Sequence, residues 1–177
     1  MKIILISGRA GNGKDATATL MSGILEAEGK RVLVTHYADL LKFILTKFFG
    51  WDGQKDEHGR YLLQHVGTDV IRKQNPDFWV DFIITLMKYF SDEWDYVLIP
   101  DARFPNEIER WKEEGFDVTT VRVVRPEFES ALTAKQMNHP SETALNDYPF
   151  DYVITNDGTL KELRERAEMV LSYISLR

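Results

Sequence analysis

Residues 2–15 read KIILISGRAGNGKD: an apolar run passes into a stretch with three glycines and ends on a lysine and an aspartate. The apolar run has the character of a strand buried on both faces. The glycines let the backbone curl so that N–H groups face a phosphate chain, and the lysine adds charge at the start of a helix. A ligand-free glycine turn is the alternative, but the strand–helix context favours a P-loop for a nucleoside triphosphate. The residues expected at the phosphates are Gly8, Arg9, Ala10, Gly11, Asn12, Gly13, Lys14, Asp15 and Ala16.

Two carboxylates are candidates for binding magnesium beside this loop. Asp15 stands where the general motif has Ser or Thr, and a carboxylate can approach Mg²⁺ directly or through water. Asp101 follows the apolar run at residues 96–99, at the edge of the sheet where such enzymes place a second magnesium contact. The alternatives are a helix N-terminal charge for Asp15 and ordinary turn chemistry for Asp101.

The composition of the 177 residues predicts one packed domain, with 44% hydrophobic residues, a net charge of −6 and no cysteine. The missing cysteines exclude disulfides and thiolate metal sites, and the acidic balance disfavours a partner among nucleic-acid polymers. The four histidines have no metal-ligand spacing, so we expect no metal besides the magnesium of the nucleotide. No apolar run approaches the ~20 residues of a membrane span, and no signal peptide is recognisable. We therefore expect a soluble, cytoplasmic protein without membrane contact.

Strand and helix patterns alternate along the chain. Strands are predicted at residues 2–7, 31–37, 96–99, 118–124 and 151–155, and helices at 14–28, 40–49, 61–73, 78–89, 107–114 and 159–175. Asp39 is expected to cap the helix at 40–49. This alternation predicts an α/β protein with three layers, α/β/α, around a doubly wound, mainly parallel sheet of about five strands. The polar segment 125–148 is typical of a lid or binding loop.

Three arginines are candidates for handling phosphate. An acceptor that is itself a phosphate needs a fixed guanidinium fork, and Arg103 and Arg72 are placed to supply one. Arg125 begins the lid-like segment and could act as an internal arginine finger. A solvated surface position is the alternative for each.

Two further segments allow two interpretations each. Residues 139–142, HPSE, are either a catalytic pair or, as we favour, a lid element in which Ser141 caps a short helix. Phe78, Trp79 and Phe82 have helical spacing that favours a place in the core, although one of these rings could line a base pocket.

Six segments, in order along nearly the whole chain, carry a resemblance. They are residues 7–15, 37–42 (YADLLK), 63–69 (LQHVGTD), 101–107 (DARFPNE), 139–142 (HPSE) and 156–160 (NDGTL). Together they resemble the deoxynucleoside monophosphate kinases best known from bacteriophages, which are adenylate-kinase-like P-loop kinases. In that family an aspartate after the P-loop lysine is normal. Animal-type phosphomevalonate kinase and dephospho-CoA kinase share the early P-loop pattern but fit residues 64–69 and 139–142 less well.

The resemblance implies ATP-dependent phosphorylation of a (deoxy)nucleoside monophosphate to the diphosphate. It implies a single domain, residues 1–177, in which residues 39–92 form a helical insert for the monophosphate and residues 125–148 form a lid. Asn156 and Gly158 would lie near the adenine. The implied acceptor-side residues are Asp39, Lys42, Gln64, Thr68, Arg72, Trp79, Asp101, Arg103 and Glu142.

The expected mechanism is in-line transfer with ATP and Mg²⁺ as cofactors and without a covalent intermediate. The residues expected to take part in catalysis are Lys14, Asp15, Arg103 and Arg125. The competing functions are a kinase of another phosphorylated small molecule and an ATP-binding module without transfer activity. The base and sugar preference, a homodimer, and a phage origin with action in the host cytoplasm stay open.

Overall fold

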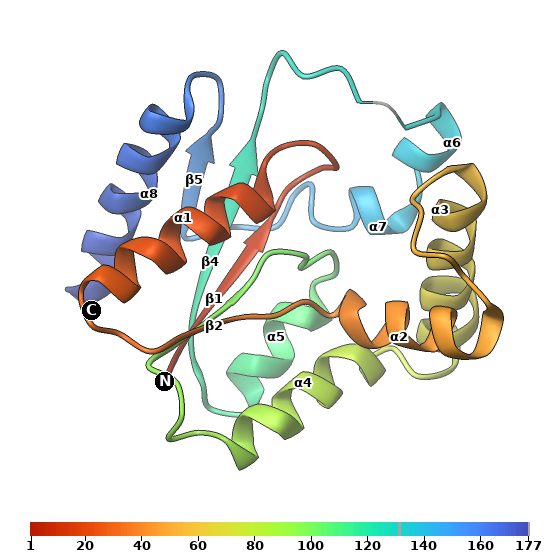
Figure 1. The fold of residues 1–177 in the computed structure, drawn as a ribbon, viewed down its shortest axis with the longest axis horizontal. Coiled ribbons are helices and arrows are strands. Elements are labelled where there is room, and N and C mark those ends of the chain that lie inside the picture. The colour runs from red at the N-terminus through yellow and green to blue at the C-terminus, as the bar shows by residue number, and fades with distance from the viewer. Residues whose placement is uncertain (131, 177) are drawn as a thin grey trace.

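The computed structural model describes residues 1–130 and 132–176, so residue 131 of the expected lid lies outside the described part. A parallel sheet with strand order β2-β3-β1-β4-β5 runs through the centre of this part of the chain (Figure 1). Its strands are β1 (Lys2–Ser7), β2 (Val32–Val34), β3 (Tyr96–Ile99), β4 (Asp117–Val124) and β5 (Tyr152–Thr155). The predicted five-stranded parallel α/β fold is confirmed.

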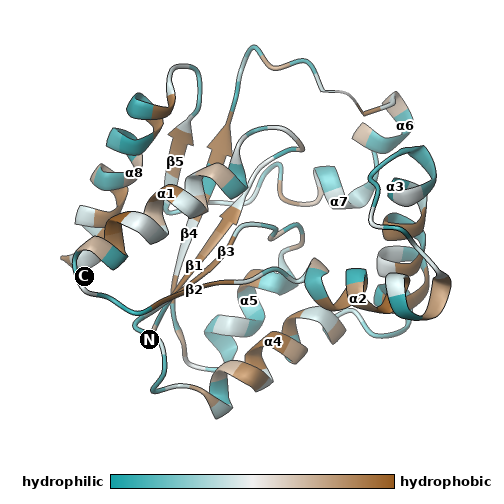
Figure 2. Ribbon diagram, in the orientation of Figure 1, coloured by the Kyte–Doolittle hydropathy of each residue, from teal (hydrophilic) through white to brown (hydrophobic). Residues whose placement is uncertain are grey.

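Helices cover both faces of the sheet because β1 carries apolar residues on each face. Ile4 and Ile6 pack with α1 (Lys14–Ala27) and α8 (Leu160–Ser175). Ile3 and Leu5 point the other way, as alternation along a strand requires, and pack with α4 (Phe78–Tyr89) and α5 (Asn106–Glu113). The apolar residues of β1 appear brown in Figure 2.

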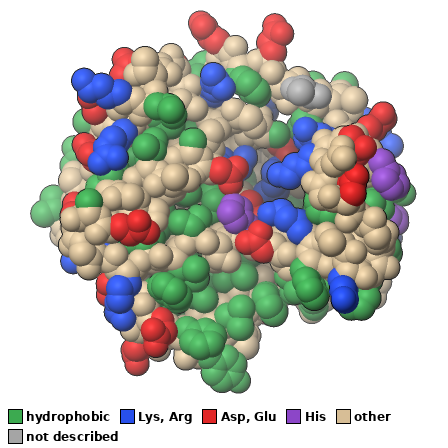
Figure 3. All heavy atoms as spheres, in the orientation of Figure 1, with side chains coloured by type: hydrophobic (Ala, Val, Ile, Leu, Met, Phe, Trp, Pro, Cys, Tyr) green, Lys and Arg blue, Asp and Glu red, His purple; other side chains and the backbone are tan. Residues whose placement is uncertain are grey.

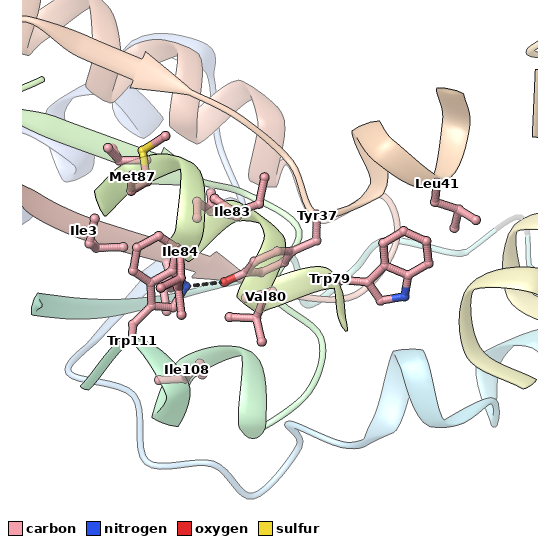
Figure 4. Close-up of a cluster of buried hydrophobic side chains, with 14 of the residues drawn as sticks. Ile3, Tyr37, Leu41, Trp79, Val80, Ile83, Ile84, Met87, Ile108 and Trp111 are labelled. Atoms are coloured by element: carbon pink, nitrogen blue, oxygen red, sulfur yellow. Dashed lines mark hydrogen bonds between the residues drawn. The ribbon is translucent and has the colours of Figure 1, made fainter. Parts of the chain in front are cut away.

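The core under α4 and α5 contains a buried polar link. Trp111 Nε1 donates to Tyr37 Oη at 2.7 Å, and Tyr37 Oη donates to the carbonyl of Glu107 at 2.9 Å (Figure 4). Burial raises the pKa of Tyr37 far above its ordinary value, so the phenol stays protonated and can donate. This link attaches the start of the segment after β2 to α5.

The expected helical insert, residues 39–92, contains most of α2 (Ala38–Phe49), all of α3 (Glu57–Gln64) and a π-helix, η1 (His65–Arg72), and also α4. The prediction of a single helix at residues 61–73 is therefore wrong in where the helix begins and in its winding. The helix begins earlier because Asp56 caps it by accepting from Gly59 N at 2.7 Å. Its second half is wound more widely, and there the Gly67 carbonyl accepts from Trp79 Nε1 at 3.0 Å, a partner that local sequence does not reveal.

The predicted cap of the 40–49 helix is also wrong. Helix α2 begins at Ala38, and Asp39 lies inside its first turn, where it accepts from His36 N at 3.1 Å. The amides of Tyr37 and Ala38 instead donate to Asp101, each at 3.0 Å. A carboxylate from the end of β3 thus does the work expected of a local cap.

The lid-like segment contains two short helices, α6 (Ala134–Met137) and α7 (Pro140–Thr143). His139, not Ser141 as predicted, caps α7: its Nδ1 accepts from Ser141 N at 3.2 Å. The strand predicted at residues 31–37 is shorter, since the chain turns into α2 after Val34. Within the ranges described, no helix is both long enough and apolar enough to cross a membrane.

Candidate active site

A cavity of about 280 Å³ opens at the carboxyl edge of the sheet, between the P-loop, the helical insert and the lid. Figure 3 shows a hollow in which lysine, arginine and acidic side chains gather. Predicted site residues from segments far apart in sequence meet in the cavity wall: Ala10, Lys14, Asp15, Lys42, Gln64, Thr68, Arg72, Trp79, Asp101, Arg103 and Glu142.

The P-loop adopts a conformation that requires glycine at critical positions. Gly13, the residue before α1, has φ 95°, and a Cβ there would lie 2.5 Å from Asn156 Nδ2. Asn156 in turn donates from Nδ2 to the carbonyl of Asn12 at 3.0 Å. The loop after β5 is thereby attached to the P-loop.

Lys14 lines the cavity and is almost completely buried. The residue is 7% exposed, and its Nζ donates to the carbonyl of Arg9 at 3.1 Å. Burial, and next the positive charge of Arg103, lower the pKa of Lys14 to about 8. Two cations held this close favour an anionic ligand between them.

Asp15 and Asp101 differ in their surroundings although both line the cavity. The Asp15 side chain is 80% exposed and lies 3.0 Å from His36 Nε2, a contact that lowers the pKa of this carboxyl. Asp101 is partly buried and accepts the two amides at the start of α2; its removal from water raises its pKa. The Asp15 carboxylate is therefore accessible to solvent, while the Asp101 carboxylate is fixed by backbone hydrogen bonds in the cavity wall.

The Asp15 and Asp101 carboxylates fit a magnesium ion whose other ligands are phosphate oxygens and waters. Among the described residues, no group of three or more His, Cys, Asp or Glu side chains could enclose a metal by itself. Mg²⁺ usually keeps several waters and takes one or two carboxylates plus the phosphates of its substrate. Asp15 and Asp101, at the edge of the P-loop cavity, provide such a pair.

Arg103 and Glu142 connect the end of β3 to the lid. Arg103 donates from its guanidinium to Glu142 and to the carbonyl of Ser141, the latter at 3.0 Å. The other carboxylate oxygen of Glu142 accepts from the amide of Ala10 at 3.1 Å. The lid thus places a carboxylate, 7% exposed, directly on a backbone amide of the P-loop.

Arg72 is held in the cavity wall by α5. It pairs with Glu107, and its guanidinium lies 3.9 Å from the centroid of the Phe104 ring. Glu107 also accepts from the amides of Arg103 at 2.6 Å and Phe104 at 3.1 Å. Burial raises the pKa of Glu107, and the charge of Arg72 opposes this rise. Glu107 therefore organises both arginine-bearing segments.

Several predicted residues lie outside the main cavity. Arg125 lies 4.9 Å from the centroid of the Phe128 ring, in a separate hollow that Arg9 and Asn12 also line. Asp39 does not line the cavity and pairs with Lys42 at 2.8 Å. The remaining predicted residues that do not line the main cavity are Gly8, Gly11, Gly13, Ala16, Asn156 and Gly158.

Among the described residues, four charged side chains of the cavity were not predicted from the sequence: His36, Lys55, Arg60 and Glu107. His36 follows β2, so the rule that ligands bind beyond the carboxyl ends of strands could have identified it. Glu107 closes a segment already quoted for the resemblance. Lys55 and Arg60 belong to a polar stretch that reads as an unremarkable loop and gives no such signal.

Comparison with known proteins supports a kinase family. A family model described as deoxynucleotide monophosphate kinase matches residues 27–167. The deoxynucleotide monophosphate kinase of Escherichia phage RB69 is 37% identical over 114 residues, which are 63% of this chain and 44% of that enzyme. The uncharacterised protein ORF77 of Ictalurid herpesvirus 1 (strain Auburn) is 34% identical over 170 residues, 95% of this chain and 69% of that protein. The chain thus spans less than half of its phage relative.

A solved structure shares the fold. The APS kinase CysC of Mycobacterium tuberculosis, in complex with AMPPNP and APS, superposes with a TM-score of 0.56 at 16% identity, over 98% of this chain and 97% of that one. At this identity the likeness concerns the architecture alone.

Proposed function

The chain belongs to the deoxynucleotide monophosphate kinase family, and from this premise we propose that it transfers the γ-phosphoryl group of ATP to a (deoxy)nucleoside monophosphate. The observation that carries the proposal is the single cavity in which Lys14 of the P-loop meets side chains of the helical insert, residues 39–92, and of the lid, residues 125–148. A transferase needs donor and acceptor in one space, whereas an ATP-binding module does not.

On the donor side, the P-loop amides and Lys14 would hold the β- and γ-phosphates of ATP. Asn156, already attached to Asn12, and the neighbouring Gly158 are proposed to lie beside the adenine. Asp15 and Asp101 would hold Mg²⁺, Asp101 through water because both of its oxygens already accept amides. Bound Mg²⁺ would neutralise charge that develops on the phosphates.

On the acceptor side, Lys42, Gln64, Thr68 and Trp79 line the wall formed by the insert and are proposed to contact the monophosphate. Arg103 is better placed than Arg72 to grip its phosphate, since the side chain of Arg103 is 30% exposed and that of Arg72 is 11% exposed. Arg72 would act mainly by shaping the wall.

The proposed reaction needs no general base, because an oxygen of the acceptor phosphate is already ionised. Lys14 and Arg103 would draw the two phosphates together and stabilise the charge of the transition state. Closure of the lid would exclude water and prevent ATP hydrolysis. Arg125 lies outside the cavity, so its proposed role as an arginine finger requires movement of the lid.

A coupled assay of ADP release across a panel of ribo- and deoxynucleoside monophosphates tests this function. We expect release that depends on ATP and on at least one monophosphate, and that a folded Lys14→Ala variant loses. No ADP release with any monophosphate of the panel, with ATP binding intact, would favour the binding module instead.

A further inference from the structure

His36 connects two carboxylates at the rim of the cavity. Its Nε2 lies 3.0 Å from Asp15 Oδ1, and its Nδ1 lies 3.4 Å from Asp39 Oδ2. Asp39 is itself held, since it accepts from the amide of His36 at 3.1 Å and from Lys42 Nζ at 2.8 Å. A continuous chain of polar contacts therefore runs from helix α1 through the imidazole into helix α2.

Asp15 depends on this imidazole for its orientation. Its side chain is 80% exposed, and within the described part of the chain His36 is the only residue that makes a polar contact to its carboxylate. An exposed aspartate without such a contact exchanges among staggered rotamers. The contact uses Oδ1 and leaves Oδ2 available, so the imidazole selects one rotamer with one oxygen free.

We propose that His36 is a positioning residue that holds the Asp15 carboxylate in the orientation required by the magnesium ion of the bound nucleotide. The inference rests on the proposed function, because that function places Mg²⁺ at Asp15. Partners behind a metal-binding side chain fix its orientation, and removing them typically costs about 10–100-fold in metal affinity. Because His36 precedes α2, the same contact couples the P-loop helix to the first helix of the acceptor insert.

Calorimetric titration of ATP, once with Mg²⁺ and once with EDTA, tests the proposal. His36→Phe keeps the bulk of the ring and removes both nitrogens, while His36→Gln keeps a donor that can reach Asp15. We expect His36→Phe to weaken binding of ATP with Mg²⁺ about ten-fold, to leave binding in EDTA unchanged, and His36→Gln to retain most of the affinity. His58→Ala is the matched control, since His58 is exposed on α3 and does not line the cavity.

A double-mutant cycle that combines His36→Phe with Asp15→Ala gives the second readout. If His36 acts through Asp15, adding His36→Phe to Asp15→Ala should weaken ATP binding with Mg²⁺ no further. Equal losses with Mg²⁺ and in EDTA, or additive losses in the double variant, would overturn the inference in favour of a purely structural role. Wild-type protein whose ATP affinity does not respond to Mg²⁺ would instead contradict the magnesium requirement of the proposed function, and this inference with it. Circular dichroism identifies a variant that fails to fold, in which case His36→Asn replaces His36→Phe.

Discussion

The ammonium group of Lys14 is kept where a positive charge is costly. Burial and the nearby Arg103 lower the pKa of Lys14 to about 8, and its hydrogen bond to the carbonyl of Arg9 offers only partial compensation. Glu142, Asp15 and Asp101 oppose the shift without cancelling it, and a phosphate chain would supply further negative charge. The buried charge of Lys14 therefore destabilises the ligand-free protein, and a bound anion would stabilise that charge.

Replacing Lys14 by alanine should separate these two effects. We expect kcat to fall by about 10²–10³-fold or more, because a charge that acts on the transition state is lost. The melting temperature should stay the same or rise, because a buried charge is removed as well. Turnover and thermal unfolding measured on the same preparation check both expectations. Near-normal turnover in a folded variant would contradict the P-loop assignment.

Arg103→Lys should weaken the acceptor side alone. A lysine keeps the charge but loses the fork, which costs about 1.5–3 kcal/mol for one charge-assisted contact, or roughly ten- to a hundred-fold in kcat/KM for the monophosphate. ATP affinity measured without acceptor should barely change. Arg125→Lys is the contrasting variant, with lower kcat and little change in either affinity. A loss of ATP affinity as large as the acceptor effect would place Arg103 on the donor side.

At the scale of elements, contacts between distant segments build the site. The first amide of helix α2 donates to the Asp101 carboxylate at the end of β3. Glu107 of α5 pairs with Arg72 of η1 and accepts from the backbone amide of Arg103. The position of this side of the cavity thus depends on packing between layers. A change in one of these carboxylates should affect stability as well as chemistry.

Asp15→Asn and Asp101→Asn form a matched pair that tests this dependence. Both should raise the Mg²⁺ concentration for half-maximal rate, since each removes an anionic partner of the ion. Only Asp101→Asn should destabilise the fold, by about 1–3 kcal/mol, because its amide group must face a buried N–H. Magnesium titrations and denaturant unfolding measure the two effects. If the magnesium dependence is unchanged in both variants, Asp15 and Asp101 do not bind the ion and have only capping and turn roles.

Local signals account for most of the elements and long-range contacts account for the rest. The apolar runs around Ile3 and Val97 predict strands correctly because each strand is buried on both faces. The wide turns of η1 accompany a contact between Gly67 and Trp79, and the start of α2 depends on Asp101. The pairing of Arg103 with Glu142 spans 39 positions. No periodicity encodes such partners.

At the scale of the whole molecule, the edge of the sheet is held partly by charge. Arg31 precedes β2, and its guanidinium donates to Asp95 before β3 at 3.0 Å, as does its backbone amide at 2.8 Å. These hydrogen bonds lower the pKa of Asp95 to about 2. Because the pKa in the folded protein is depressed, the ionised form favours folding above the ordinary value of 3.8, and this contribution is lost as the pH falls towards 2.

Asp95→Asn should therefore destabilise the protein at pH 6 and have little effect near pH 2.5. The difference in urea midpoint between wild type and variant should shrink steadily below about pH 4. Asp92→Asn is the control, since it removes a neighbouring charge whose side chain makes no ion pair within the described ranges. A difference that stays constant with pH would show that the pair contributes nothing through its charge.

The central position of β1 has a consequence for synthesis of the protein. Lys2 pairs with Tyr96 on one side and with Asp117 on the other, so β1 has no neighbour in the sheet until the ribosome has added more than 90 further residues. At ordinary elongation rates of about 5–20 residues per second, this apolar strand waits for roughly 5–20 s. During this time the nascent chain presents a segment that any other unpaired strand can bind. The strand that leads into the P-loop is thus also one that cellular chaperones would have to protect until β3 has been made.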